Sequence, residues 1–242
     1  MLRLMFRVML AEIGMLVMAL ASPLTGEMLN AQGNMTTREA AATISPKFLS
    51  LGKTAKTVTN ETETAATGHK FKKTSHGITT KMMIVITELN GKVLTASTVG
   101  ESVGGLVLGG FYWAHEVSAN EFAIAWTKAQ AESATEGEWV EYTAAIKTTT
   151  KFAVVEEATV TARVEAKWNA AANVTNELEK AVTIESNANS QEITFLLGYS
   201  ASSGGTICLC QPAEEPFRTL QKGDKYEVPT AGSKISQTGF VI

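Results

Sequence analysis

The sequence predicts an all-β protein, an antiparallel β-sandwich, and three observations lead to this fold class. Several stretches alternate apolar and polar residues, turn-forming residues separate them at short intervals, and no stretch after residue 40 has the 3.6-residue apolar period of a helix. The chain has 242 residues, enough for a large β domain with its own core. The longest alternating stretches favour a variant in which an elongated sheet carries an amphipathic hairpin.

Residues 1–21 have the layout of a secretory signal peptide. Arg3 and Arg7 precede an apolar run over 13–21, and a small-residue cleavage sequence ends at Ala21. An N-terminal membrane anchor is the less favoured alternative, because the uninterrupted run is about half of the roughly 20 residues that a helical span needs. We therefore expect a secreted, extracellular protein.

Residues 22–78 predict a loosely structured N-terminal arm. The region is rich in Thr, Ala, Lys and Gly, and it alternates only weakly over 56–64, so we expect one or two strands there. Lysines surround Phe71 between His69 and Lys73. That basic cluster suits either a solvated loop or contact with anionic headgroups.

The predicted sandwich domain spans residues 79–242 and begins with a hairpin. Asn90-Gly91 is a strong type I′ turn signal, because both central residues of that turn need positive φ. Strands over 81–88 and 92–97 should therefore pair. Further strands are predicted over 104–114, 121–129, 138–146, 191–200 and 205–210.

Two consecutive stretches, 159–168 and 174–185, alternate over lengths that suit a long hairpin with its turn at 169–173. Ten such residues span about 33 Å, which a transmembrane β-strand needs. Two interpretations remain open: a sheet wall solvated on one side, or a membrane-insertion hairpin with one face toward lipid. The apolar face of that hairpin consists of Val160, Val164, Trp168, Val174, Leu178 and Val182.

Four aromatic residues form a second candidate site for membrane or glycan contact: Tyr112, Trp113, Trp139 and Tyr142. Aromatic rings at one end of a β-sandwich stack on sugars or sit at a membrane interface. The alternative is that they are core residues of paired strands, an interpretation that we favour for Trp139 and leave even for Tyr112 and Trp113.

Charge and motifs argue against several classes of function. The formal net charge of −3 offers no attraction to nucleic acid. Asp224 is the only aspartate, which nearly excludes a Ser-His-Asp triad or an EF-hand, and the three histidines are scattered. We expect no enzyme activity, metal or cofactor, although a pair of glutamates could still serve a glycosidase. Cys208 and Cys210 are expected to be buried free thiols.

Three sequons support a eukaryotic secretory route and predict glycosylation at Asn34, Asn60 and Asn173. Each is an Asn followed by a Thr two positions later. Such triplets also arise by chance in chains rich in Asn and Thr, so they add support to the signal peptide rather than proof of secretion.

The segment 81–142 resembles the β-sandwich cytolysins, namely the actinoporins and more loosely the aegerolysins. The resemblance rests on the apolar run at 84–86 before the Asn-Gly turn, and on a Thr-Glu-Gly step at 135–137 into a stretch that ends in Tyr142. The Tyr- and Trp-rich choline-phosphate site of the actinoporins is absent, so no lipid-site residue is carried over. The amphipathic hairpin that follows is more similar to the aerolysin-type pore formers.

The cytolysin resemblance implies a protein that binds membrane lipid and assembles into a homo-oligomeric pore. The stretch 137–143 is also similar to a strand of family-6-like carbohydrate-binding modules. Our leading prediction is a secreted, membrane-binding, cytolysin-like protein. A secreted carbohydrate-binding β-sandwich that recognises a cell-surface glycan is the first alternative, and a structural extracellular protein is the second.

Overall fold

The computed structural model confirms an all-β antiparallel fold. It describes residues 46–95, 98, 100–169, 175–205, 207–213, 218–230, 234–236 and 239–241, so the predicted signal peptide at 1–21 lies outside the described residues. The main sheet has ten strands. Its path runs β15 (Ile207–Pro212), β14 (Phe195–Tyr199), β1 (Phe48–Thr59), β9 (Lys151–Glu157), β3 (Met83–Leu89), β7 (Phe111–Ser118), β8 (Glu121–Ala125) and β2 (Lys70–Lys72).

Shorter strands complete the described part of the fold. β10 (Val164–Glu165) pairs with β1, and β4 (Lys92–Val93) pairs with β3. The small sheets combine β11 (Thr175–Glu177), β18 (Lys234–Ser236) and β19 (Gly239–Val241); β12 (Val182–Glu185) and β17 (Lys225–Val228); β13 (Gln191–Ile193) and β16 (Arg218–Leu220); and β5 (Ser102–Val103) and β6 (Leu106–Val107). Two short helices are described, α4 (Lys128–Glu132) and the 3-10 turn η1 (Glu136–Glu138).

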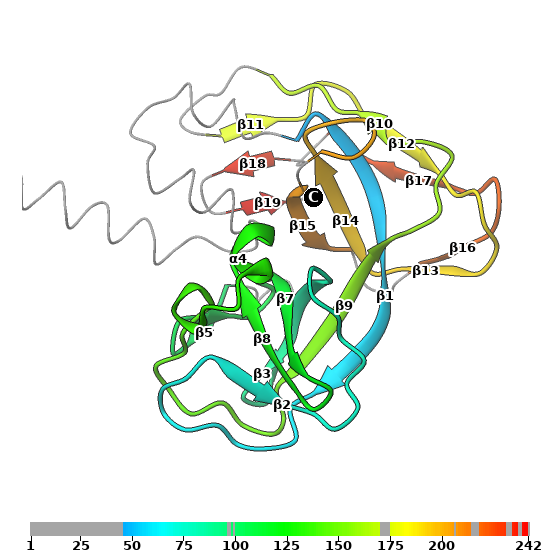
Figure 1. Cartoon of the computed structure of the whole chain (residues 1–242). Coiled ribbons are helices and arrows are strands. Elements are labelled where there is room, and N and C mark those ends of the chain that lie inside the picture. Colours follow the sequence, from blue (N-terminus) through cyan, green and yellow to red (C-terminus); the bar gives the residue numbers. More distant parts are fainter. Residues whose placement is uncertain are drawn as a thin grey trace, which may run out of the picture.

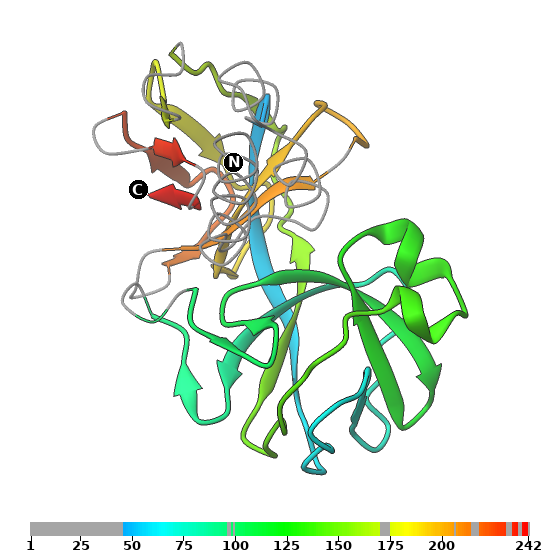
Figure 2. The same cartoon turned by 90° about the vertical axis from the view of Figure 1, so that its left-hand side faces the viewer.

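The main sheet connects two lobes. The aromatic lobe contains β2 to β8 with α4 and η1, and the hairpin lobe contains β10 to β19 (Figure 1). Seen from the side, β1 and β9 continue from one lobe into the other (Figure 2). The two lobes are therefore held together by continuous strands and not by a flexible linker.

Three apolar cores line the two faces of this sheet. The aliphatic core, which includes Leu49, Leu196 and Leu178, lies within the hairpin lobe. The aromatic core, which includes Phe71 and Phe122, fills the aromatic lobe. A third core, built on residues from both lobes, occupies the opposite face of the sheet. Successive residues of β9 alternate between the aromatic and the third core, as strand geometry requires.

The predicted boundary at residue 79 is not a structural boundary. β1 lies inside the predicted arm, yet it pairs with β14 on one side and with β9 on the other, so it is an interior strand of the main sheet. The register of β1 with β9 shifts between Thr54 and Lys56. This bulge changes which side chains face the core, because one extra residue inverts the alternation. Before the bulge the odd-numbered Leu51 is buried in the aliphatic core, and after it the even-numbered Val58 is buried in the aromatic core.

The Asn-Gly hairpin is confirmed. Asn90 and Gly91 both have positive φ, 52° and 92°, as a type I′ turn requires. The flanking residues Leu89 and Lys92 are directly opposite each other. The second strand is described over only two residues, shorter than predicted.

Two predicted strands are wrong in part or in whole. The strand over 121–129 stops at Ala125, because Thr127 accepts a hydrogen bond from the Gln130 backbone and caps α4. Residues 138–146 form an irregular crossing instead of a strand, with a single β-bridge between Tyr142 and Gly68. The apolar residues of this crossing are nevertheless buried in the aromatic core, which is the feature that imitated a strand.

Candidate functional site

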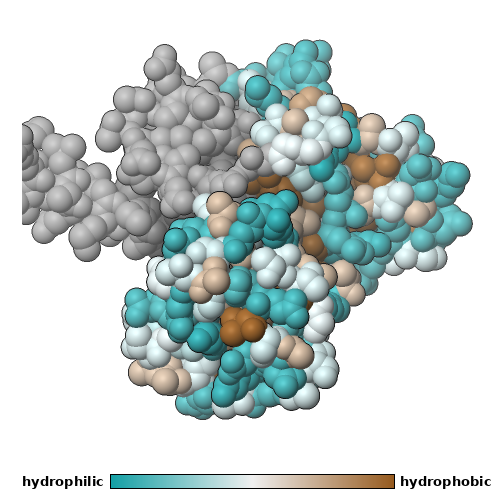
Figure 3. All heavy atoms as spheres, viewed as in Figure 1, coloured by the Kyte–Doolittle hydropathy of each residue, from teal (hydrophilic) through white to brown (hydrophobic). Residues whose placement is uncertain are grey.

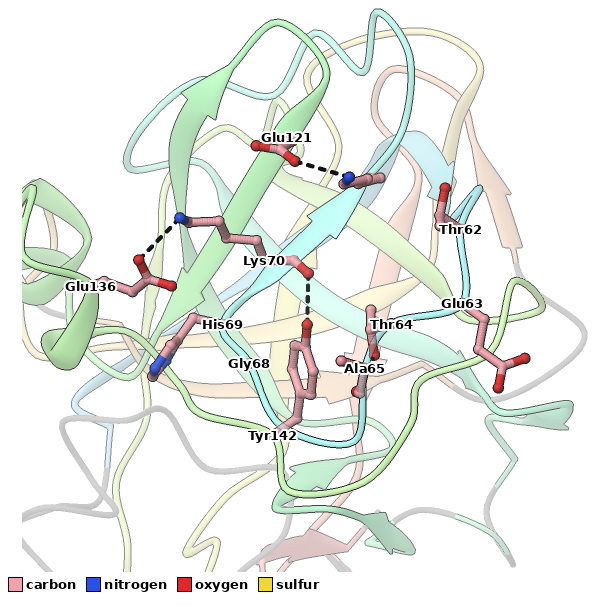
Figure 4. Close-up of a pocket in the computed structure, with 11 residues that line it drawn as sticks. Thr62, Glu63, Thr64, Ala65, Gly68, His69, Lys70, Glu121, Glu136 and Tyr142 are labelled. Atoms are coloured by element: carbon pink, nitrogen blue, oxygen red, sulfur yellow. Dashed lines mark hydrogen bonds and ion pairs between the residues drawn. The ribbon is translucent and has the colours of Figure 1, made fainter.

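A polar pocket beside β2 is the candidate binding site. Its volume is about 310 Å³. It lies at the end of the main sheet, where β2 is the last strand of the path (Figure 4). The lining residues are Thr62, Glu63, Thr64, Ala65, Gly68, His69, Lys70, Lys72, Glu121, Glu136 and Tyr142.

Tyr142 forms the floor of this pocket and depends on a glycine opposite it. Its hydroxyl donates to the Lys70 carbonyl over 2.9 Å, and burial raises its pKa, so the hydroxyl stays protonated. A Cβ added at Gly68 would lie 2.7 Å from that hydroxyl oxygen. Only glycine therefore lets the Gly68 backbone approach the ring closely enough for the bridge between the two segments.

Asn60 anchors the pocket loop, the stretch 60–69 between β1 and β2 that contributes much of the pocket lining. Its side-chain nitrogen donates to the Thr62 carbonyl over 2.7 Å and to the Ile146 carbonyl over 3.4 Å. Its side-chain oxygen accepts from the Lys72 backbone over 3.2 Å. The predicted glycosylation at Asn60 conflicts with this geometry, because the residue is 1% exposed and the nitrogen that would carry the glycan is already hydrogen-bonded inside the fold. Asn34 and Asn173 lie outside the described residues.

Charges on the pocket wall occur as pairs. The Lys70 amine lies 3.0 Å from Glu136, and the Lys72 amine lies 3.5 Å from Glu121. In Figure 4 the Lys70 side chain turns toward Glu136 while its backbone carbonyl receives the Tyr142 hydroxyl. The basic cluster noticed in the sequence is thus partly neutralised by glutamates more than 45 positions away, which no local sequence pattern could reveal.

Glu61 clamps the outer edge of the same loop. Its carboxylate accepts hydrogen bonds from the Lys73 amine and from the Thr74 backbone and hydroxyl, the last two at 2.8 and 2.9 Å. These bonds, that of Lys73 foremost, lower the pKa of Glu61 to about 2. Nearby, the His69 Nδ1 is buried and has no hydrogen-bond partner among the described residues.

The four aromatic residues predicted to contact a membrane or a glycan are core residues. Tyr112 is fully buried, and Trp113, Trp139 and Tyr142 are 9%, 7% and 4% exposed. The Trp139 indole donates to the Ser133 carbonyl and stacks on His115 at a centroid distance of 4.5 Å. The prediction of an exposed aromatic platform is therefore wrong, and of these four residues only Tyr142 lines the pocket.

The two predicted hairpin segments are antiparallel neighbours. Bridges join Val160 to Ser186 and Trp168 to Leu178. These bridges are eight residues apart along both segments, so they belong to one register. Continuous long strands are nevertheless wrong, because the central residues pair elsewhere: β10 with β1, and β12 with β17.

The apolar face of these segments points into the protein. Leu178 and Val182 are buried in the aliphatic core, and Val160, Val164 and Trp168 pack against it while partly buried. Val174 lies outside the described residues. The sheet-wall interpretation therefore describes the geometry of this structure, and insertion into a membrane stays a prediction.

The described surface offers few exposed apolar groups. Hydrophilic residues cover most of the face in Figure 3, with smaller hydrophobic areas between them. Among the described residues, Val93 is the one large hydrophobic side chain that is exposed, at 57%. Within the same residues, no helix has the length and apolar character to cross a membrane, and no three His, Cys, Asp or Glu side chains gather as metal ligands would.

Comparison with known proteins adds no assignment. No family model, no curated protein and no solved structure matches the chain. The resemblance to cytolysins therefore rests on the short motifs alone.

Proposed function

We propose that this protein is a secreted carbohydrate-binding protein that takes one neutral sugar unit of a cell-surface glycan into the pocket beside β2. The observation that carries the proposal is a pocket of about 310 Å³ whose lining includes hydroxyl, carboxylate and ammonium groups. A volume near 300 Å³ is at the small end of ligand sites. It therefore suits a single sugar ring better than an extended chain.

The chemistry of the wall suits hydroxyl groups, which both donate and accept hydrogen bonds. The Thr62 side chain offers a hydroxyl of the same kind, the glutamates accept, and the lysines donate. The Thr64 hydroxyl already donates to the Ala65 carbonyl and accepts from the Ile146 amide. Each lysine is already paired with a glutamate, and Glu63 adds a further carboxylate to the lining. The surplus of negative charge favours a neutral ligand over an acidic one.

The proposal is for binding without hydrolysis. A glycosidase needs one carboxyl group as an acid and a second as a base or nucleophile. Glu121 and Glu136 are instead each engaged by a lysine amine. Release of reducing sugar from any bound glycan would replace the binding proposal by an enzymatic one.

The test is titration of the full-length protein with a panel of neutral monosaccharides, followed by NMR. We expect saturable chemical-shift changes for residues around β2. Glu136→Gln should raise the Kd about tenfold, because a hydrogen bond to a charged group contributes about 1.5–3 kcal/mol. Glu132→Gln is the matched control. Glu132 also pairs with a lysine and its side chain is 48% exposed, against 50% for Glu136, but it lies outside the pocket lining.

Three outcomes would contradict the carbohydrate proposal. The first is the absence of saturable shifts with every neutral sugar. The second is equal weakening by both glutamate variants, which would indicate a nonspecific charge effect. The third is tighter binding of an acidic sugar than of every neutral sugar by the wild-type protein, which would show that the pocket selects anions.

We also propose a second function, membrane binding and homo-oligomeric pore formation by the 159–185 hairpin. The observation that favours it is the single antiparallel register of the two segments with one apolar face. Such a hairpin could leave its place in the fold as a unit, with the apolar face toward lipid and the polar face toward water.

A tether between hairpin and sheet tests this second proposal. Phe48 and Glu165 are opposite each other, next to a hydrogen bond from Ala166 to Lys47, so they form a non-hydrogen-bonded pair with closely spaced Cα atoms. Phe48→Cys with Glu165→Cys should abolish dye leakage from vesicles when oxidised and restore it when reduced. Absence of leakage from wild-type protein across neutral and anionic vesicles would refute pore formation.

A further inference from the structure

Arg163 joins three separate parts of the hairpin lobe. Its Nε and Nη2 donate to the two carboxylate oxygens of Glu157, both over 2.8 Å. Its Nη1 donates to the carbonyls of Ala201 and Gly204 over 3.2 and 2.6 Å. Its guanidinium carbon lies 3.3 Å from the centroid of the Tyr199 ring. One side chain thus contacts the end of β9, the end of β14 and the loop that follows β14.

These contacts leave little of the guanidinium for any other partner. Four of its five N–H donors are used, and its face is stacked on a ring. The Arg163 side chain is 13% exposed and that of Glu157 is 30% exposed. A lysine could not reproduce the set, because a bidentate fork and a planar stack both require the guanidinium. The group is therefore an internal fastening and not a binding site for an external anion.

The segment that carries Arg163 has few other direct ties to the main sheet. The Ala158 amide donates to the Leu51 carbonyl and the Ala166 amide to the Lys47 carbonyl, both over 2.8 Å. Between them β10 pairs two residues with β1, and the Trp168 indole donates to the Pro46 carbonyl over 2.7 Å. Residues 161–163 belong to no strand, and Thr161 and Ala162 are exposed. Between the Ala158 bond and the β10 pairing, the contacts of Arg163 tie the segment to the end of β9 and to the 200–205 loop.

We propose that Arg163 is a latch that closes the 200–205 loop over the 158–169 segment and holds both on the main sheet. Loss of the latch frees the loop and the segment together, while the aromatic lobe stays folded, because none of the Arg163 contacts reaches that lobe's core. The latch rests on these contacts alone. It does not depend on whether the freed segment enters a membrane or whether the pocket binds sugar.

Hydrogen exchange followed by mass spectrometry of the full-length protein tests the latch. Arg163→Ala should accelerate backbone exchange about 10- to 100-fold in peptides covering 158–169 and 200–205 and leave peptides of β7 and β8 unchanged. Arg163→Lys keeps the charge but loses the fork and the stack, so it should give an intermediate acceleration in the same two regions.

Arg218→Ala is the matched control from the same lobe. Arg218 also lies over a tyrosine, with its guanidinium carbon 5.7 Å from the Tyr226 centroid, but it is exposed. It should leave both latch regions unchanged. Glu157→Gln removes the charge of the partner without a large change of shape and should accelerate the same peptides if Arg163→Ala misfolds. Uniform acceleration across the chain in both variants, or unchanged exchange at 158–169, would overturn the proposal.

Discussion

The two lobes share one sheet, yet they fill their cores in different ways. In the aromatic lobe, the rings of Phe71, Phe122 and Phe152 contact one another at centroid distances of 4.8 to 5.5 Å. In the aliphatic core of the hairpin lobe, the buried side chains are mainly Leu, Ile, Val and Ala, with Tyr226 as the one ring, while Phe195 and Tyr199 of β14 belong to the third core. Each aromatic ring buries about 150–250 Å², so the aromatic lobe gains more packing from fewer residues.

Because of this difference, we expect the aromatic lobe to be rigid and the hairpin lobe to depend more on hydrogen bonds and ion pairs. Irregular loops can be fixed where large rings pack beneath them, as in the crossing at 138–146 that borders the pocket. Apart from β10, β14 and β15, which belong to the main sheet, the hairpin lobe consists of small sheets of two or three strands. Such sheets are only marginally stable without further contacts. Its opening should therefore cost less free energy than unfolding of the aromatic lobe.

The largest expected effect comes from removing a ring of the aromatic core. Phe122→Ala should lower the free energy of unfolding by about 4 kcal/mol, because the side chain contacts Phe71, His76 and Phe152 and leaves a cavity. Leu178→Ala in the aliphatic core should cost less, about 3 kcal/mol, with loss of protection confined to the hairpin lobe. Urea unfolding together with hydrogen exchange measures both. The comparison of the lobes would be contradicted if both variants lost the same free energy of unfolding and both lost exchange protection across the whole molecule.

Asn60→Ala should have the next largest effect, about 3 kcal/mol. It leaves the Lys72 amide and the Thr62 carbonyl without the Asn60 side chain as partner, whereas the Ile146 carbonyl keeps its bond from the Thr64 amide over 3.0 Å. The pocket loop should loosen, so sugar binding should fall more than stability alone accounts for. Asn60→Asp distinguishes the contributions of the two amide atoms, because Asp keeps the oxygen that accepts from the Lys72 amide and lacks the nitrogen that donates to the Thr62 carbonyl. A wild-type melting curve for Asn60→Ala would show that these bonds contribute nothing net.

Gln191 is the equivalent hub in the hairpin lobe. Its amide exchanges hydrogen bonds with the Thr159 backbone over 2.6 and 2.9 Å and donates to the Ser186 hydroxyl over 2.9 Å. Gln191→Ala should cost about 2 kcal/mol, less than Asn60→Ala, because the more weakly packed lobe can relax and let water reach the exposed groups. Parallel urea titrations compare the two hubs. A larger cost for Gln191→Ala would mean that the hairpin lobe is the more rigid one.

Two stretches of similar length explain how far the sequence could predict this fold. Residues 158–168 alternate without a break and form one two-residue strand, whereas β1 alternates poorly and forms twelve residues of strand. Alternation reports which side of a segment is buried and not which backbone it pairs with. In β1 the bulge near Ala55 interrupts the phase, and local turn chemistry, as at Asn90-Gly91, was a more reliable guide.

The candidate pocket could not be predicted for a related reason. Its charged pairs join residues that are distant in sequence, such as Lys70 and Glu136, and its floor comes from Tyr142 on a crossing that imitates a strand. The one local signal was the basic cluster around Phe71, and that signal did not reveal the partners of its lysines. Of the four aromatic residues predicted as contacts, only Tyr142 lines the pocket, and Tyr112 and Trp113 belong to the aromatic and the third core.

The smallest effect concerns the pH dependence of the pocket loop. The pKa of Glu61 is lowered from 4.5 to about 2, so its hydrogen bonds to Lys73 and Thr74 stabilise the folded loop above pH 4.5. That contribution falls as the pH drops below 4.5 and is lost once it passes about 2. Because Glu61 is exposed, solvent screens the interaction and global stability should barely change.

An NMR titration of the Glu61 carboxyl carbon measures this pKa directly. Lys73→Ala should move it back toward 4.5, because the Lys73 hydrogen bond is the largest cause of the shift. Lys222→Ala changes the net charge equally from the other lobe and should leave the Glu61 titration in place. A wild-type midpoint near 4.5 would show that the loop is not clamped in solution. The pocket would then owe its shape only to Asn60 and to the aromatic core beneath it.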